Sequence, residues 1–206
     1  MPTLYTMPGT CSLACNIAVA WLDAPVEVHT MEYGDHKKDA YLAINPKGKV
    51  PAVAMDDGST LTELPAIMAW LGAEHGGEGY ARDTKLGREE DEALCWMSSE
   101  VHASYAPLFA PKMFAESEGG QDEVQAAVKK TLKGHYDRME EQLSGDWYLG
   151  ERSFADAFLY VLTRWMPKAD LSLDDYPRLK AFQGRMEADG KVKLALKRQD
   201  MEPASG

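Results

Sequence analysis

The chain has only three cysteines among its 206 residues, and they stand at positions 11, 15 and 95. An odd, irregularly spaced set argues against the disulfide framework of a small secreted protein and favours a reducing compartment. The N-terminal residues also lack the basic start and long apolar stretch of a secretory signal. No apolar run approaches the about 18 residues that a membrane-spanning helix needs. We therefore expect a cytoplasmic protein that does not bind membranes.

Basic residues are also scarce, because 22 Lys and Arg face 33 Asp and Glu and leave a formal net charge of -11. Such a surface repels phosphate backbones, which excludes nucleic acid as an expected partner. The five histidines show no zinc-like spacing with the cysteines. The glycine-rich stretch at 76–79 does not follow a strand pattern, so it is not a phosphate-binding loop. We expect no metal site and no permanently bound cofactor.

Strand and helix patterns alternate over residues 1–78, which indicates an α/β domain that begins with a βαβ unit and a parallel pair of strands. The turn pair Pro8-Gly9 ends the first strand pattern, and Asp57-Gly58 is typical of a hairpin turn. The expected strands are 3–6, 26–31, 50–55 and 59–62, and the expected helices are 11–22, 37–43 and 63–73.

Glycines at 76–79 interrupt this alternation, and strand patterns are absent from the chain that follows. Long helical patterns replace them, so residues 84–206 are predicted to form an all-α domain. Ser153 and Asp156 have the spacing of a capping box, which indicates the start of a helix. The expected helices are 86–114, 122–143, 153–165, 177–188 and 192–197.

Cys11 carries the clearest chemical signal, because it lies where the first strand pattern gives way to a helix pattern. The unpaired N–H groups and the positive dipole end of a helix favour a thiolate, which is the reactive form of cysteine. Glu63 also stands at a helix start, directly after the predicted hairpin. There it either compensates the helix dipole or receives a ligand's ammonium group while the helix N–H groups receive its carboxylate.

Several motifs, taken together and in order, resemble those of the cytosolic glutathione transferases. The first half carries Asn45–Pro51 and Leu61–Glu63, and the second half carries Ser153–Phe158. The stretches Pro8–Leu13 and Ser99–Phe109 narrow the resemblance to the bacterial beta class. The resemblance covers nearly the whole chain and implies a thioredoxin-like N-terminal domain joined to an all-helical C-terminal domain.

The resemblance also implies a site and partners. Taken alone, the Val50-Pro51 bond is predicted to be trans, because only about 5–6% of X-Pro bonds are cis in folded proteins; the family implies a cis bond that turns the Val50 main chain toward glutathione. Glutathione is then a co-substrate, a small and largely apolar electrophile is the second substrate, and the protein is a homodimer. The implied catalytic residues are Cys11 and His102, and the implied glutathione-binding residues are Val50, Pro51, Glu63, Leu64, Ser99 and Lys37, with Lys38 as the alternative to Lys37.

Two positions depart from the family pattern. Leu64 stands where Ser or Gly is common and supplies only a backbone N–H, and Ala103 replaces a lysine that often follows the histidine. These departures keep open a non-catalytic binding or regulatory protein on the same fold. A second alternative is a glutathione-dependent thiol–disulfide oxidoreductase that uses Cys11 as its nucleophile. If Cys11 only assists conjugation, Ser12 is the candidate that activates the glutathione thiol. We expect Cys15 to be a packed thiol. Cys95 either lines the pocket or is a buried thiol, and we favour the second.

Overall fold

The computed structural model describes residues 1–204, and within them the first half of the chain forms one four-stranded sheet. Its strands are β1 (Thr3–Thr6), β2 (Glu27–Thr30), β3 (Ala52–Ala54) and β4 (Thr60–Thr62). They lie in the order β2-β1-β3-β4, with β1 parallel to β2 and β3 antiparallel to both β1 and β4. The parallel pair and the hairpin predicted from the sequence are confirmed.

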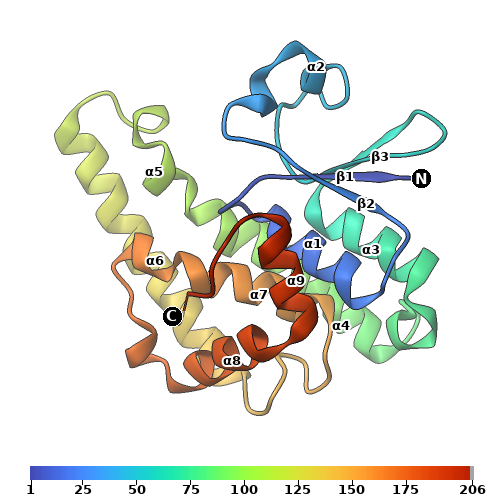
Figure 1. The fold of residues 1–206 in the computed structure, drawn as a ribbon. Coiled ribbons are helices and arrows are strands. Elements are labelled where there is room, and N and C mark those ends of the chain that lie inside the picture. Colours follow the sequence, from blue (N-terminus) through green and yellow to red (C-terminus); the bar gives the residue numbers. More distant parts are fainter. Residues whose placement is uncertain (205–206) are drawn as a thin grey trace.

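Three helices accompany the sheet: α1 (Ser12–Trp21), α2 (Asp39–Leu42) and α3 (Leu64–His75). Helices α1 and α3 cover one face of the sheet, while α2 lies on the opposite side (Figure 1). On that opposite side Tyr41 packs with Met31 and Ala52 in a small separate cluster. The sheet is therefore thinly covered on the side of α2, and its main core lies on the side of α1.

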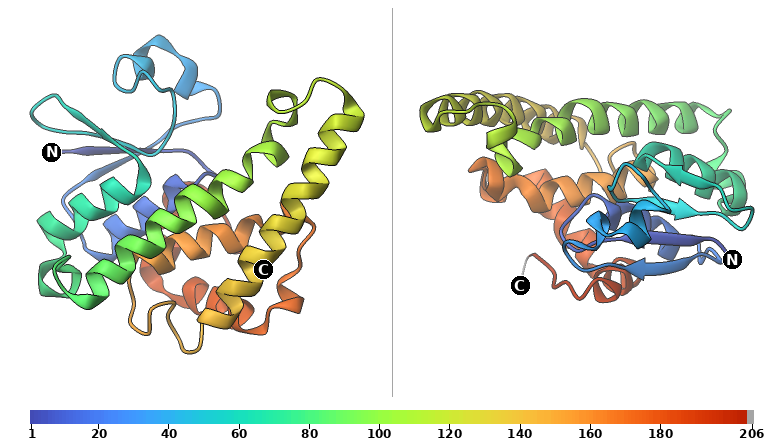
Figure 2. Two further views of the ribbon diagram at one scale, coloured as in Figure 1. Left: turned by 180° about the vertical axis from the view of Figure 1, so that it is seen from behind. Right: turned by 90° about the horizontal axis from the view of Figure 1, so that it is seen from above.

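Among its described residues, the second half has helices joined by loops and no strand, and in a view from above these helices form layers beside the sheet (Figure 2). Short 3-10 turns occur at 35–37, 77–80, 111–113, 166–169 and 173–175. The longer elements are α4 (Lys85–Trp96), a π-helical turn (Met97–His102), α5 (Ala106–Phe109), α6 (Glu118–Gln142), α7 (Phe154–Trp165), α8 (Pro177–Ala188) and α9 (Gly190–Arg198).

The prediction of one continuous helix from 86 to 114 is wrong. The chain passes from α4 into the π-helical turn, then into the single short helix α5, and Ala110 leaves the helical region at φ -141°. Pro107 and Pro111 lack the backbone N–H that would continue an α-helical ladder. Hydrophobic periodicity does not register such breaks, because the apolar residues keep nearly the same spacing through them.

The capping box at the start of α7 is present as predicted. The Ser153 N–H donates to Asp156 Oδ2 at 2.8 Å, and the Tyr148 N–H donates to Oδ1 of the same carboxylate at 2.8 Å. Glu90 of α4 adds a second carboxylate, whose Oε2 accepts from the Phe154 N–H at 2.6 Å. Three otherwise unpaired donors at and before this helix start are thus satisfied by two buried or half-buried carboxylates.

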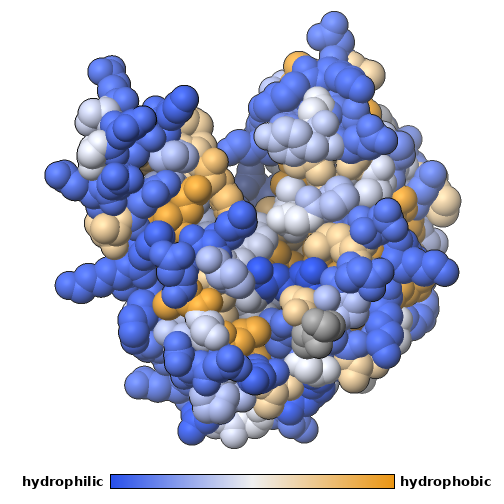
Figure 3. All heavy atoms as spheres, turned by 60° about the vertical axis from the view of Figure 1, so that its left-hand side comes forward, coloured by the Kyte–Doolittle hydropathy of each residue, from blue (hydrophilic) through white to orange (hydrophobic). Residues whose placement is uncertain are grey.

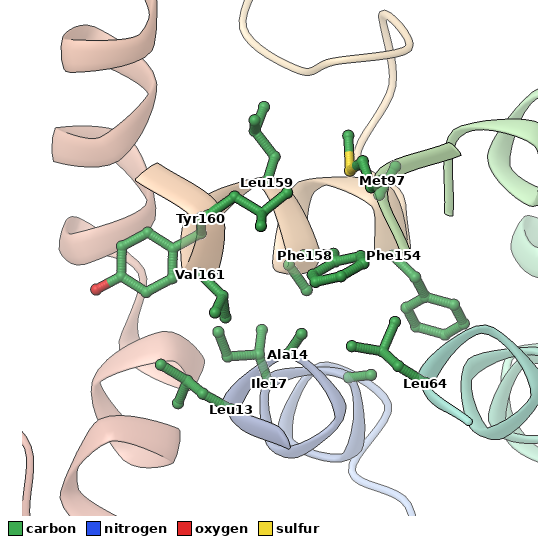
Figure 4. Close-up of a cluster of buried hydrophobic side chains, with 14 of the residues drawn as sticks. Leu13, Ala14, Ile17, Leu64, Met97, Phe154, Phe158, Leu159, Tyr160 and Val161 are labelled. Atoms are coloured by element: carbon green, nitrogen blue, oxygen red, sulfur yellow. The ribbon is translucent and has the colours of Figure 1, made fainter. Parts of the chain in front are cut away.

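Helix α1 joins the two halves into one hydrophobic core. All ten of its residues are buried, because α3 and the sheet cover one side and α7 and α9 cover the other. Leu13, Ala14 and Ile17 of α1 face Phe158 and Val161 of α7 in this core (Figure 4). Cys15 is fully buried here, which confirms that it is a packed thiol. Across residues 1–204, no helix combines the length and apolar composition that crossing a membrane would require.

Candidate functional site

A cavity of about 260 Å³ opens where the two halves of the chain meet, and Cys11 forms part of its wall. Cys11 is half-buried and directly precedes α1, and its Sγ lies 3.8 Å from the Val50 carbonyl oxygen. Space filling shows a hollow between the lobe that carries α2 and the lobe that carries α5 (Figure 3). The cavity is lined by Cys11, Asn45, Lys47, Lys49, Val50, Pro51, Thr62, Glu63, Leu64, Ser98, His102 and Phe158.

The Val50-Pro51 peptide bond is cis, as the family resemblance implies and as the local sequence does not. The loop before it is held by two donors to the Lys49 carbonyl, the Tyr41 hydroxyl at 2.6 Å and the Asn45 amide at 2.7 Å. Gly48 adopts φ +57°, and a Cβ there would lie 3.0 Å from a backbone oxygen. The loop is therefore fixed on both sides, and the Val50 main chain is presented along the cavity wall.

Glu63 stands at the start of α3 in an unusual backbone conformation, with φ 71° and ψ 121°. Its side chain is exposed and accepts from Lys47 Nζ at 2.8 Å. The next residue, Leu64, buries its side chain in the core, so only its main chain is available to the cavity. The first N–H groups of a helix have no partner inside the helix. This corner of the cavity therefore offers a carboxylate beside backbone donors.

His102 enters the cavity from the π-helical turn of the second half. Its ring packs against Trp165, with centroids 5.2 Å apart, and against Phe158, with centroids 5.9 Å apart. Burial lowers the pKa of His102, and the positive charge of Lys49 lowers it further. The imidazole is accordingly neutral at pH 7 and can accept a proton.

The structure contradicts the prediction that helix α1 favours a thiolate at Cys11. Burial raises the pKa of the Cys11 thiol to about 12, and the negative charge of Glu63 contributes in the same direction. The main-chain N–H of Cys11 and the charge of Lys49 oppose this effect only in part. Removal of the sulfur from water therefore outweighs the helix terminus, and Cys11 is a protonated thiol at neutral pH.

Two of the residues expected at the site lie outside this cavity. Ser99 is exposed, and its hydroxyl donates to the Cys95 carbonyl at 2.9 Å, whereas Ser98 lines the cavity with His102. A π-helical turn holds more residues than an α-helical turn, so the face shared with His102 moves to a different position. Lys37 also lies outside the cavity wall, and the lysines on that wall are Lys47 and Lys49.

Further expectations about neighbouring residues are corrected. Cys95 is exposed and is not a packed thiol, because it lies on the outer side of α4. Ser12 is fully buried, and its hydroxyl is bonded to Thr10 and Met7, so it cannot act as the activator. Ala103 is exposed beside His102, so the side chain at that position points away from the cavity. Sequence reasoning missed Ser98, Lys47 and Lys49, although the two lysines stand inside the quoted Asn45–Pro51 motif.

Among the described residues, no group of three His, Cys, Asp or Glu side chains gathers closely enough to hold a metal ion. The acid–base groups that line the cavity are Cys11, Glu63, His102 and two lysines. Together with the cis-proline loop, they define an arrangement suited to binding an extended peptide-like ligand with a charged end.

Both halves of the chain match known family models. Residues 9–74 match the glutathione S-transferase N-terminal domain, and residues 96–189 match the glutathione S-transferase C-terminal domain. The glutathione S-transferase GST-4.5 of Xanthomonas campestris is 31% identical over 96% of this chain and 98% of its own length. GstA of Escherichia coli O157:H7 is also 31% identical, over 97% of this chain and 99% of its own length.

Solved structures agree with these relatives. A sphingomonad glutathione S-transferase in complex with glutathione is 33% identical, covers 97% of this chain and 100% of its own, and has a TM-score of 0.84. A beta-class glutathione S-transferase from Sphingomonas chungbukensis is 32% identical, with the same coverage and a TM-score of 0.84. Fold and sequence therefore define a transferase enzyme with a thioredoxin-like N-terminal domain. The chain belongs to the glutathione S-transferase family and is similar to its bacterial beta class.

Proposed function

We propose that the protein binds glutathione in the cavity beside Cys11 and transfers it to small, largely apolar electrophiles. The observation that carries this proposal is the convergence of Cys11, the Val50 main chain, Glu63 and His102 on one cavity. These groups come from both halves of the chain, and each matches a feature of an extended peptide with a thiol and a charged end. The bound-glutathione neighbours of the same family support this ligand.

Each part of glutathione has a complementary group on the cavity wall. The Val50 N–H and C=O, turned toward the cavity by the cis bond at Pro51, pair with the cysteinyl part as an added strand would. Glu63 receives the γ-glutamyl ammonium group, and the Leu64 N–H receives its carboxylate. We assign the glycyl carboxylate to Lys49 in place of Lys37, and the polar wall contact to Ser98 in place of Ser99.

The reaction begins with loss of the glutathione thiol proton. Neutral His102 accepts that proton, and the resulting thiolate attacks the electrophilic carbon, where a carbon–sulfur bond forms and the leaving group departs with its electron pair. Cys11 remains a thiol because burial raises its pKa to about 12, so it donates an S–H hydrogen bond toward the substrate sulfur. Cys11 therefore stabilises the substrate thiolate without becoming a nucleophile itself.

Thiol–disulfide exchange through Cys11 is the weaker alternative. A thiol with its pKa raised to about 12 holds almost no thiolate near pH 7, and the thiolate is the attacking form. The relatives that match over nearly the full chain are named as transferases. The proposal also includes the homodimer expected from the resemblance and the cytoplasmic location expected from the cysteine usage. Sedimentation of the purified protein measures whether it is a dimer.

Calorimetry and two assays test the proposal. We expect glutathione to bind in the micromolar to millimolar range, and Cys11→Ala to retain conjugation to an aromatic halide within about tenfold. We expect disulfide exchange to be slow already in the wild type, because Cys11 holds almost no thiolate. Cys15→Ala is the matched control, because that thiol is buried one turn further along α1. Absence of binding at millimolar glutathione would overturn the proposal. Loss of both activities in Cys11→Ala, with normal folding, would show that Cys11 does more than assist.

A further inference from the structure

A second cavity, of about 240 Å³, adjoins the first one across the ring contact between His102 and Trp165. Thr10 lies on its wall and directly precedes Cys11, and the Trp165 indole N–H donates to the Gly9 carbonyl at 3.1 Å. Val161 lines it one helical turn after Phe158, which lines the first cavity. The two cavities thus share the Gly9–Cys11 turn and one face of α7, so a molecule in the second cavity lies next to the glutathione sulfur.

The second cavity is built to hold a flat ring. Phe109 and Trp165 stand nearly perpendicular, with centroids 5.1 Å apart and an interplanar angle of 85°. Leu13 and Val161 form an aliphatic floor, and Met201 of the C-terminal tail closes one side with its sulfur 3.4 Å from the Gly9 nitrogen. The volume lies below the about 300–1,000 Å³ of sites for drug-sized ligands, which suits a single substituted ring. Two perpendicular aromatic faces favour stacking and edge contacts with such a ring.

Two cations line this cavity, but only one of them is available. Arg164 is already engaged, because it donates to the Tyr160 hydroxyl and the Glu202 carbonyl at 2.9 Å each and lies 3.6 Å from Glu187. Lys168 is exposed, and within residues 1–204 it forms no ion pair. The nearby Asp170 is paired instead with Lys129, at 2.6 Å.

Lys168 places a positive charge on the wall of this partly apolar cavity, on a chain whose net charge is -11. Such a cation attracts a carboxylate more strongly than it would on a uniformly solvated face, because the cavity wall excludes water from one side. It also repels a cationic ligand. With the electrophile of the proposed transfer seated in this cavity, we propose that Lys168 selects planar aromatic electrophiles that carry a carboxylate or a similar anionic group. This inference rests on the proposed glutathione transfer.

A pair of matched substrates tests the selection by charge. We would compare 4-chloro-3,5-dinitrobenzoate with its methyl ester, since both lose chloride when the glutathione sulfur bonds to the ring carbon and a proton is released. The ratio of kcat/KM to the uncatalysed rate corrects for their different reactivity. We expect this ratio to favour the benzoate at least tenfold at low ionic strength, and the preference to shrink as salt screens the lysine.

Lys168→Gln is expected to raise KM for the benzoate about tenfold and to change kcat/KM for the ester less than twofold. Lys168→Arg restores most of the benzoate preference because it keeps the charge. Lys112→Gln removes the same charge from an exposed position outside both cavities, and we expect it to behave like the wild type. If Lys168→Gln does not fold, as judged by circular dichroism, the Lys168→Arg variant and the salt dependence of the wild type still decide.

The outcomes separate this inference from the proposed function. Failure of the ester to react, together with no glutathione binding, would overturn the proposed function itself. Conjugation of the ester without a preference for the benzoate would overturn only the selection by Lys168, and so would an equal loss for both substrates in Lys168→Gln. A benzoate preference that disappears in Lys168→Gln and persists in Lys112→Gln supports the inference.

Discussion

Lys47 Nζ lies 2.8 Å from Glu63 Oε1 and also donates to the Thr62 hydroxyl at 2.9 Å. The pair is exposed, so it contributes at most about 1 kcal/mol to folding. Its position matters more than its strength, because Lys47 occupies the carboxylate that we assign to the ammonium group of glutathione. Under that assignment, Lys47 and the ammonium group of glutathione compete for the Glu63 carboxylate, so Lys47 must move aside or share it when glutathione binds.

Glu63→Gln is expected to weaken glutathione binding at least tenfold, because the amide cannot pair with the ammonium group as a charge. The free energy of unfolding should change by less than about 1 kcal/mol, since the ion pair with Lys47 is exposed. Calorimetric titration and urea unfolding measure the two effects. Glu89→Gln, which removes the exposed partner of Lys85 outside the cavity, is the control. Equal glutathione affinities of Glu63→Gln and Glu89→Gln would contradict the assignment of Glu63 to the ammonium group.

Lys49→Ala is expected to raise the dissociation constant for glutathione about three- to tenfold. Lys49 lines the cavity and its charge reaches both Cys11 and His102, whereas Lys37 lies outside the cavity wall. Lys37→Ala should change the dissociation constant less than twofold. Titration of both variants at two salt concentrations tests this, and a larger effect from Lys37 would restore the position expected from the sequence.

The pH profile of conjugation should reflect a neutral His102. Burial and Lys49 lower the pKa of this histidine, so we expect the acidic limb of kcat/KM to lie below the ordinary histidine range near about 6.5. His102→Gln should lower kcat by roughly 10²-fold, a typical contribution of a positioned base. His135→Gln is the control, because this half-buried histidine of α6 packs against Trp96 and lies outside the cavity. An unchanged rate in His102→Gln would remove the histidine from the mechanism.

Stability should fall as pH rises through the titration of Glu90. Burial raises the pKa of Glu90 to about 7 from the ordinary 4.5, so the folded protein holds a proton that the unfolded chain has released. The free energy of unfolding therefore decreases between these pH values and levels off above them. Glu90→Gln keeps an acceptor for the Phe154 N–H but removes the titration.

The difference in unfolding free energy between wild type and Glu90→Gln should thus change by about 1–2 kcal/mol between pH 5 and pH 8, in favour of the variant at high pH. Asp156, whose pKa burial raises to about 6, titrates in both proteins, and its negative charge also helps to raise the pKa of Glu90. Urea unfolding at four pH values gives the slope. Parallel curves for the two proteins would show that Glu90 does not titrate in this range.

Two buried tyrosines of the second half should differ sharply in their response to loss of the hydroxyl. The Tyr136 hydroxyl donates to the Leu162 carbonyl at 2.6 Å and lies 2.8 Å from the Tyr105 hydroxyl. Tyr136→Phe therefore strands two buried groups and should cost about 2–4 kcal/mol, whereas Tyr105→Phe should cost about 1 kcal/mol. Chemical unfolding measures both, and the reverse order would mean that water reaches this pair.

The sequence predicts most of the fold because strand and helix patterns and turn pairs are local features. Cys11, Val50 and Glu63 reach one cavity because each stands beside the start or end of an element at the same side of the sheet. The local sequence indicates these starts and ends. The cis bond at Pro51 is not local: it is stabilised by surroundings that no dipeptide records, and only the family motif indicates it.

The remaining differences arise where packing decides the outcome. Because of the π-helical turn, Ser98 lines the cavity with His102, and Ser99 does not. A prediction based on 3.6 residues per turn cannot show this shift. Cys95 is exposed because it lies on the outer side of α4, whereas the usual preference of cysteine for the protein interior predicts the opposite. The raised pKa of Cys11 depends on how deeply the neighbouring elements bury the sulfur, which is decided by residues from both halves.

The burial of α1 has a consequence for how the chain is made. One side of this helix is covered by α9, which is synthesised long after it. Until residues 190–198 arrive, the nascent chain carries an apolar helix surface with no partner, and exposed apolar surface on incomplete chains promotes aggregation. We therefore expect the core around α1 to pack completely only after α9 has been synthesised.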